Sequence, residues 1–188
     1  MSAPTKTQTK MRPNAQRNSQ PLADDIFAAL RAAKIDLIAH VPDAGHRRLL
    51  DLAGATPTVT VAPLATEEDG IALLAGAWLG GRRGALLMQS SGVGNCINML
   101  SLPRICRLPL LMIVTMRGQW GEFNPWQVPM GQASAEILKA QGVICLHVDD
   151  ASEVGVTVEA AARLVFEGPQ SAAVLLGQRL IGTKTFGK

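Results

Sequence analysis

Residues 58–89, "TVTVAPLATEEDGIALLAGAWLGGRRGALLMQ", decide the fold because they place a helix-like segment between two strand-like segments. Residues 58–64 are rich in β-branched side chains and predict a strand. Residues 84–89 form a continuous apolar run, which is typical of a strand buried on both faces. Between them, residues 66–81 predict a helix that ends at paired glycines. Because no hairpin turn separates the two strands, we expect them to be parallel.

The same alternation continues along the rest of the chain. Further strands are expected at residues 35–41, 108–115, 143–148 and 171–177, and further helices at residues 22–34, 44–54, 96–106, 132–142 and 151–168. Residues 90–95 predict a glycine-bearing turn, and residues 116–131 predict an irregular segment. About six strands alternating with helices predict a three-layer α/β/α domain with a mostly parallel sheet.

The length of 188 residues suits one well-buried domain, which we place at residues 21–188. Residues 1–20 are polar, hold four basic residues and no acid, and predict a disordered basic tail, with a transit peptide as the less favoured interpretation. Because this tail holds the whole positive excess, the net charge of +3 gives no case for nucleic acid as a partner. No window is apolar enough for a membrane span, and the expected location is the cytoplasm.

The three cysteines, Cys96, Cys106 and Cys145, are odd in number and scattered along the chain. They fit neither a disulfide framework nor a zinc site, so we expect small core residues in a reducing compartment. No group of His, Asp and Glu has metal-ligand spacing, so this chain by itself is expected to hold no metal.

The unusual residues of the chain follow the expected strands, in "HVPDAGH", "PLATEED", "MQSSGVGN" and "TMRGQWGEFNPWQ". Open parallel sheets bind their ligands at these carboxyl ends. The glycines of residues 90–95 do not complete a dinucleotide fingerprint, because Ile97 stands where the third glycine is required. They indicate that the backbone comes close either to another element or to a ligand.

The irregular segment at residues 116–131 contains two tryptophans, Trp120 and Trp126. Either this loop recognises a ligand or partner, or the two tryptophans form a small core of its own.

Three consecutive acids, Glu67, Glu68 and Asp69, open the helix expected after the second strand. Thr66 suits the N-cap position, Asp69 stands where a capping box places its acid, and all three acids complement the helix dipole. The residues that follow are mostly small and allow another backbone or another subunit to approach closely. A carboxyl that loses solvent in such a place is suited to donating or sharing a proton.

The stretches "EDGIALLAGAW", "LLMQSSGVGN" and "RGQWGE…QVPMG", together with the Val-Pro pair after the first strand, resemble the pyrimidine-binding domain of thiamine-diphosphate-dependent enzymes. Within that family the likeness is to the sulfopyruvate decarboxylase α subunits and phosphonopyruvate decarboxylases, and it covers residues 22–180. The resemblance implies a decarboxylase that acts on a small 2-oxo acid, such as one with a second, sulfonate or phosphonate, group.

The resemblance also implies roles for single residues. Glu68 matches the glutamate that hydrogen-bonds N1′ of the aminopyrimidine and thereby promotes the C2 ylide, while Glu67 and Asp69 remain helix-start acids. Asp43 falls near an acid that serves protonation steps in related decarboxylases. The other residues expected against the cofactor are Pro42, Ser91, Gly92 and Val93. The residues considered for contact with the substrate or a partner subunit are His40, His46, Asn95, Arg117 and Gln127.

One motif of these enzymes is missing. They hold Mg²⁺ and the diphosphate with a Gly-Asp-Gly motif and a following Asn, and no Gly-Asp-Gly occurs in the 188 residues. The resemblance therefore implies a hetero-oligomer in which a separate β subunit carries the diphosphate domain and its Mg²⁺, with the active site between the chains. A non-catalytic thiamine-fold binding or scaffold subunit is the alternative, followed by a Rossmann-like nucleotide-binding domain.

Overall fold

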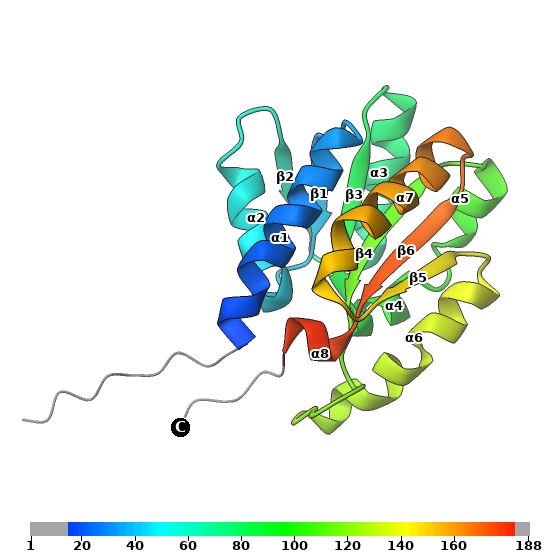
Figure 1. The fold of residues 1–188 in the computed structure, drawn as a ribbon. Coiled ribbons are helices and arrows are strands. Elements are labelled where there is room, and N and C mark those ends of the chain that lie inside the picture. The colour runs from blue at the N-terminus through cyan, green and yellow to red at the C-terminus, as the bar shows by residue number, and fades with distance from the viewer. Residues whose placement is uncertain (1–14, 183–188) are drawn as a thin grey trace, which may run out of the picture.

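A six-stranded, entirely parallel sheet forms the centre of the computed structural model, which describes residues 15–182 (Figure 1). The strand order is β2-β1-β3-β4-β6-β5. The strands are β1 (Leu37–His40), β2 (Thr60–Pro63), β3 (Gly84–Gln89), β4 (Leu110–Thr115), β5 (Ile144–Val148) and β6 (Ser171–Leu176). This arrangement confirms the predicted α/β class and the predicted six strands.

Helices cover both faces of the sheet and complete the three layers. One face is covered by α1 (Ala15–Ala32), α2 (Arg47–Gly54) and α7 (Val154–Glu167). The other face is covered by α3 (Glu67–Leu79), α4 (Ser90–Cys96), α5 (Ser101–Cys106) and α6 (Val128–Ala140). The short helix α8 (Gln178–Ile181) follows β6, and the 3-10 turns are η1 (Ala44–His46), η2 (Pro125–Gln127) and η3 (Ala151–Glu153). No helix in residues 15–182 combines the length and the hydropathy required to cross a bilayer.

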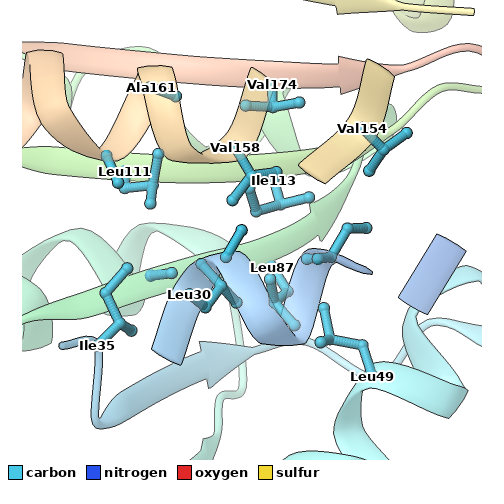
Figure 2. Close-up of a cluster of buried hydrophobic side chains, with 14 of the residues drawn as sticks. Leu30, Ile35, Leu49, Leu87, Leu111, Ile113, Val154, Val158, Ala161 and Val174 are labelled. Carbon is cyan, nitrogen blue, oxygen red and sulfur yellow. The ribbon is translucent and has the colours of Figure 1, made fainter. Parts of the chain in front are cut away.

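The core consists of two apolar layers, one on each side of the sheet. On one side, Leu87 and Ile113 of the central strands pack with Leu30 of α1 and Val158 of α7 (Figure 2). On the other side, alternate residues of the same strands pack against α3, α4 and α6. Both faces of β3 and β4 are therefore buried, as their continuous apolar sequences predicted.

Several element bounds differ from the predictions, among them the helix predicted at residues 96–106, which begins at Ser101 as α5. Helix α1 begins at Ala15, so the last six residues of the expected disordered tail are helical, and residues 1–14 lie outside the described part of the chain. The glycine-bearing segment 90–95 is not a turn but most of α4. Helix α6 begins at Val128 rather than at residue 132, because Pro129 lies in its first turn, where a missing N–H has no cost.

The connections between strands create two places where neighbouring strands send the chain to opposite faces of the sheet. From β1 the chain enters α2 on one face, whereas from the adjacent β3 it enters α4 on the other. From β4 it enters α6, whereas from the adjacent β6 it enters α8, which packs against α1. Such switch points open crevices at the carboxyl ends of the strands, where ligands of doubly wound sheets bind.

Candidate functional site

The first crevice contains the start of α3, where the structure buries Glu67. Glu67, Ile71 and Leu74 follow helical spacing and share the face that packs toward the sheet, and Glu67 is only 7% exposed. Thr66 is the N-cap residue, as predicted, but its side chain makes no capping hydrogen bond. The predicted capping box is therefore wrong, although all three acids do lie in the first turn of α3.

The side chain of Glu67 is held between two residues of α4. Asn95 donates a 2.7 Å hydrogen bond from Nδ2 to Oε2 of Glu67. A Cβ atom at Gly92 would lie 2.5 Å from the carboxyl carbon of Glu67, so only glycine leaves room for this carboxylate. Within the described residues, Oε1 of Glu67 accepts no hydrogen bond. A buried carboxylate with one fixed oxygen and one available oxygen is suited to bind a ligand N–H group.

The two neighbouring glutamates differ in burial. The structure puts Glu67 against α4, whereas Glu68 is half-buried one residue further along α3. The helical spacing of Glu67 with Ile71 and Leu74 is visible in the sequence and could have identified the inward-facing acid. Glu68 lacks that spacing and is not among the buried residues of α3.

The turn that contains Pro42 and Asp43 is fixed across the ends of the central strands. Thr115 Oγ1, at the end of β4, donates a 2.8 Å hydrogen bond to Asp43 Oδ2. His46 Nε2 donates to the carbonyl oxygen of Met88 in β3 at 3.2 Å. A Cβ atom at Gly45 would lie 2.8 Å from the Thr115 methyl group, so the turn packs directly on β4. Asp43 is therefore a constrained carboxylate at the carboxyl end of β4.

The two histidines of this region are both buried, at 9% exposure for His40 and 2% for His46. Burial lowers the pKa of each imidazole below its ordinary value of 6.5, and the nearby Asp43 only partly opposes this effect at His46. Both rings are therefore neutral at pH 7. His46 bonds to the backbone of β3 and stabilises the turn, whereas the buried Nδ1 atom of His40 has no partner among the described residues.

Arg117, which was expected to contact the substrate or a partner subunit, lies in a buried ion pair with Glu122. It is 5% exposed and donates two hydrogen bonds to Glu122, from Nε at 2.7 Å and from Nη2 at 2.6 Å. Its Nη1 donates to Gln89 Oε1 at 3.0 Å. The ion pair with Arg117 lowers the pKa of Glu122 to about 2, so both partners are charged and neutralise one another. The importance of Glu122 was not visible in the sequence, because an Arg and a Glu five residues apart in a loop carry no geometric signal.

The remaining expected residues have mixed placements. Val93 of α4 is completely buried in the core between this helix and the sheet. Ser91 is half-buried, whereas the fully buried Ser90 accepts a hydrogen bond from the backbone N–H of Arg117 and thus ties α4 to the loop after β4. Gln127 is half-buried, and its Oε1 atom is enclosed without a hydrogen-bond partner among the described residues.

The loop after β4 exposes its aromatic residues. Trp126 is 84% exposed and Trp120 is 48% exposed, so the interpretation in which they form a small core is wrong. Trp126 and Met130 line an apolar groove, and Met130 also packs near Gly94 of α4, next to Asn95. Recognition of a ligand or partner therefore remains the interpretation of this loop.

The cysteines follow the prediction at one position and depart from it at another. Cys96 is fully buried, and burial together with nearby Glu67 raises the pKa of its thiol to about 12, so it is an inert core residue. Cys145 is half-buried. Cys106 is exposed at the end of α5, so the expectation of a core position was wrong for this residue.

No protein-family model matches the chain. It is 40% identical over 118 residues to the sulfopyruvate decarboxylase α subunit of Methanothermobacter thermautotrophicus, and the match spans 62% of this chain and 72% of that subunit. It is 34% identical over 118 residues to the phosphonopyruvate decarboxylase of Streptomyces viridochromogenes, and this match spans 62% of the chain but only 30% of that protein.

Among solved structures, the fold is similar to that of a 2-oxoglutarate:ferredoxin oxidoreductase from Magnetococcus marinus, with a TM-score of 0.65 and 15% sequence identity over 85% of this chain and 29% of that chain. At this identity the likeness concerns the fold. The match to the Methanothermobacter protein is much higher in identity and covers most of that protein. The chain belongs to the family of the sulfopyruvate decarboxylase α subunits.

Proposed function

We propose that this chain is the α subunit of a thiamine-diphosphate-dependent decarboxylase of small 2-oxo acids of the sulfopyruvate type, and that Glu67 is its essential acid. A separate β subunit holds the diphosphate and Mg²⁺ and completes the active site between the chains. Two findings support the division into subunits: relatives of similar length are named as α subunits, and a longer decarboxylase matches over only 30% of its length.

The observation that carries the proposal is the buried carboxylate of Glu67, with Oε2 bound to Asn95 and Oε1 without a partner among the described residues. This arrangement fits an aminopyrimidine, because Oε1 is placed to accept a hydrogen bond from a protonated ring nitrogen. When bound, thiamine diphosphate supplies the electron sink that decarboxylation of a 2-oxo acid requires.

The surrounding residues keep this carboxylate in one geometry. Asn95 fixes one oxygen, and the missing side chain at Gly92 gives the carboxyl group its space. The turn around Pro42 and Asp43 is held at the carboxyl ends of the central strands by Thr115 and His46. In this proposal Glu67 holds the proton at the ring nitrogen, Pro42 lies against the pyrimidine, and Asp43 serves a proton on the substrate side.

Recognition of the second anionic group of the substrate is assigned to the partner subunit. Arg117 is neutralised by Glu122, and burial keeps His40 and His46 uncharged at neutral pH. A sulfonate or phosphonate group is bound by a cationic side chain or by several hydrogen-bond donors. In this proposal the β subunit provides the cation that binds this group of the substrate.

The test compares Glu67→Gln with Glu68→Gln in the complex reconstituted with the β subunit from the same organism. E67Q is expected to lower kcat for sulfopyruvate by about 10²-fold or more, whereas E68Q, its matched control on the same turn, retains activity within a few-fold. Equal losses in both variants, or a loss in E68Q alone, would contradict the assignment to Glu67.

Calorimetry tests the division of the site. Thiamine diphosphate with Mg²⁺ is expected to bind tightly to the reconstituted complex and weakly to this chain alone. Equal affinity for both samples would show that the diphosphate site does not depend on a second subunit.

A further inference from the structure

The second crevice, between the ends of β4 and β6, holds a cavity of about 580 Å³. Its walls come from the segments that follow three strands, with Trp120 after β4, Asp149 after β5 and Arg179 after β6, while Gln132 of α6 contributes from the side. The cavity does not include Glu67, Asn95 or Asp43. It is therefore separate from the proposed carboxylate site, and its own topology places it where parallel sheets bind ligands.

Two glutamines make this cavity rigid. Gln178 is 1% exposed, and its Oε1 accepts hydrogen bonds from the backbone N–H groups of Gln119 at 2.8 Å and Trp120 at 2.9 Å. In return, Gln119 Oε1 accepts from the backbone N–H of Gln178 at 3.0 Å. Nε2 of Gln178 donates to Glu122 at 2.9 Å. The loops after β4 and β6 are thus fastened to each other, so the cavity between them is preformed.

Opposite charges line the cavity without neutralising each other. Asp149 and Arg179 are both exposed side chains of its wall, and no ion pair in residues 15–182 joins them. The guanidinium carbon of Arg179 lies 5.4 Å from the centre of the Trp120 ring, so a cation–π contact holds this group in place. A preformed cavity with one carboxylate, one guanidinium and an aromatic wall matches a small molecule that carries both charges.

We propose that this cavity binds an α-amino acid in its zwitterionic form. The ammonium group donates to the carboxylate of Asp149, and the carboxylate accepts from the guanidinium of Arg179. The ring of Trp120 packs against the ligand side chain, and the amide of Gln132 is available at the rim. This site does not depend on the proposed decarboxylase function, because none of its lining residues belongs to the proposed carboxylate site.

The experiment is isothermal titration calorimetry of the full chain with each of the twenty protein amino acids in turn. At least one is expected to bind with a Kd below about 1 mM. Two analogues of that amino acid serve as controls: the amine that lacks the carboxylate, and the carboxylic acid that lacks the ammonium group. Each is expected to bind at least about tenfold more weakly, because the first leaves Arg179 without a partner and the second leaves Asp149 without one. If no amino acid binds, or if a singly charged analogue binds equally well, the proposal is overturned.

Variants place the binding in the cavity. Asp149→Asn and Arg179→Gln are each expected to weaken binding at least about tenfold. Both residues are exposed, so the variants keep the fold, which circular dichroism checks. Glu136→Gln is the matched control, since Glu136 is an exposed acid of α6 that lies outside the cavity, and it should leave the affinity unchanged. Unchanged affinity in both D149N and R179Q would show that binding takes place elsewhere and would overturn the assignment.

Discussion

The carboxylate of Glu67 and the side-chain amide of Asn95 are joined by a 2.7 Å hydrogen bond that links the first turn of α3 to α4. The two residues come from successive strand–helix units, 28 positions apart in the chain. The bond fixes the orientation of a carboxylate that lies almost completely out of solvent. The function proposed for the chain therefore depends on a contact between two helices rather than on a single motif.

Asn95→Ala removes this contact without changing the acid itself. We expect kcat of the reconstituted decarboxylase to fall by about tenfold to a hundredfold, because Glu67 loses the partner that orients it. Asn98→Ala is the control, since Asn98 is an exposed residue in the following turn. Steady-state kinetics of both variants measure the effect, and equal rates for N95A and wild type would contradict the orienting role.

Gly92→Ala introduces a Cβ atom 2.5 Å from Glu67. We expect the Glu67 carboxylate to be displaced, with a loss of activity at least as large as that of N95A and a lower free energy of unfolding. Gly54→Ala, at the end of α2, has no atom within 4 Å of its new Cβ and is expected to be neutral or to stabilise by up to about 1 kcal/mol. Urea unfolding measures the stability of both variants, and steady-state kinetics measure their activity. A fully active G92A would refute the expected difference from G54A.

Glu122→Gln tests how much the ion pair with Arg117 contributes to the free energy of unfolding, and how that contribution changes with pH. The pKa of Glu122 is about 2 in the folded chain against an ordinary value of 4.5, so its stabilising effect is complete above pH 4.5 and disappears as the pH falls toward 2. At pH 7 we expect E122Q to lose roughly 3 kcal/mol of unfolding free energy, because Arg117 stays buried without its counter-charge.

The difference between wild type and E122Q should narrow as unfolding is measured at successively lower pH. Glu136→Gln is the control, since the Glu136–Lys139 pair is exposed and 3.5 Å long and contributes little. A difference that stays constant between pH 6 and pH 3 would show that the charge of Glu122 is not what stabilises the loop.

Burial of His46 predicts a loss of stability in mild acid. Because its pKa is lowered in the folded chain, the unfolded chain takes up the proton first, and the free energy of unfolding decreases as the pH falls below about 6.5. His46→Gln keeps an N–H donor for the Met88 carbonyl but cannot take up a proton, so its stability should fall less between pH 7 and pH 5. His147→Gln, at an exposed position of β5, should follow the wild type in chemical denaturation at both pH values.

Much of the fold was predictable because buried parallel strands have a direct sequence signature. The boundaries of β3 follow from its apolar run, and α3 follows from its flanking Thr66 and Gly80. Helix α4 was missed because its glycines have low helix propensity, and they are tolerated there because Gly92 packs against Glu67. That packing depends on how two helices meet on the sheet, which no local pattern contains.

The site was predictable in position but not in detail. The strand-end segments contain Asp43, Glu67, Gly92 and Asn95, as the general rule for parallel sheets requires. Which of Glu67 and Glu68 points toward the sheet depends on the rotation of α3 about its axis, which the local motif does not contain. The pairing of Arg117 with Glu122 follows from the path of the loop in three dimensions. The charge of Arg117 therefore looked available in the sequence, although Glu122 neutralises it in the folded chain.

The Arg117–Glu122 pair also has an evolutionary consequence. A single substitution at either position leaves a charge buried without a counter-charge. Exchange of both for apolar residues would in addition leave Gln178 Nε2 and the backbone N–H groups of Gly118 and Asn124 without the acceptor that Glu122 provides. Descendants of this chain should therefore keep both residues together.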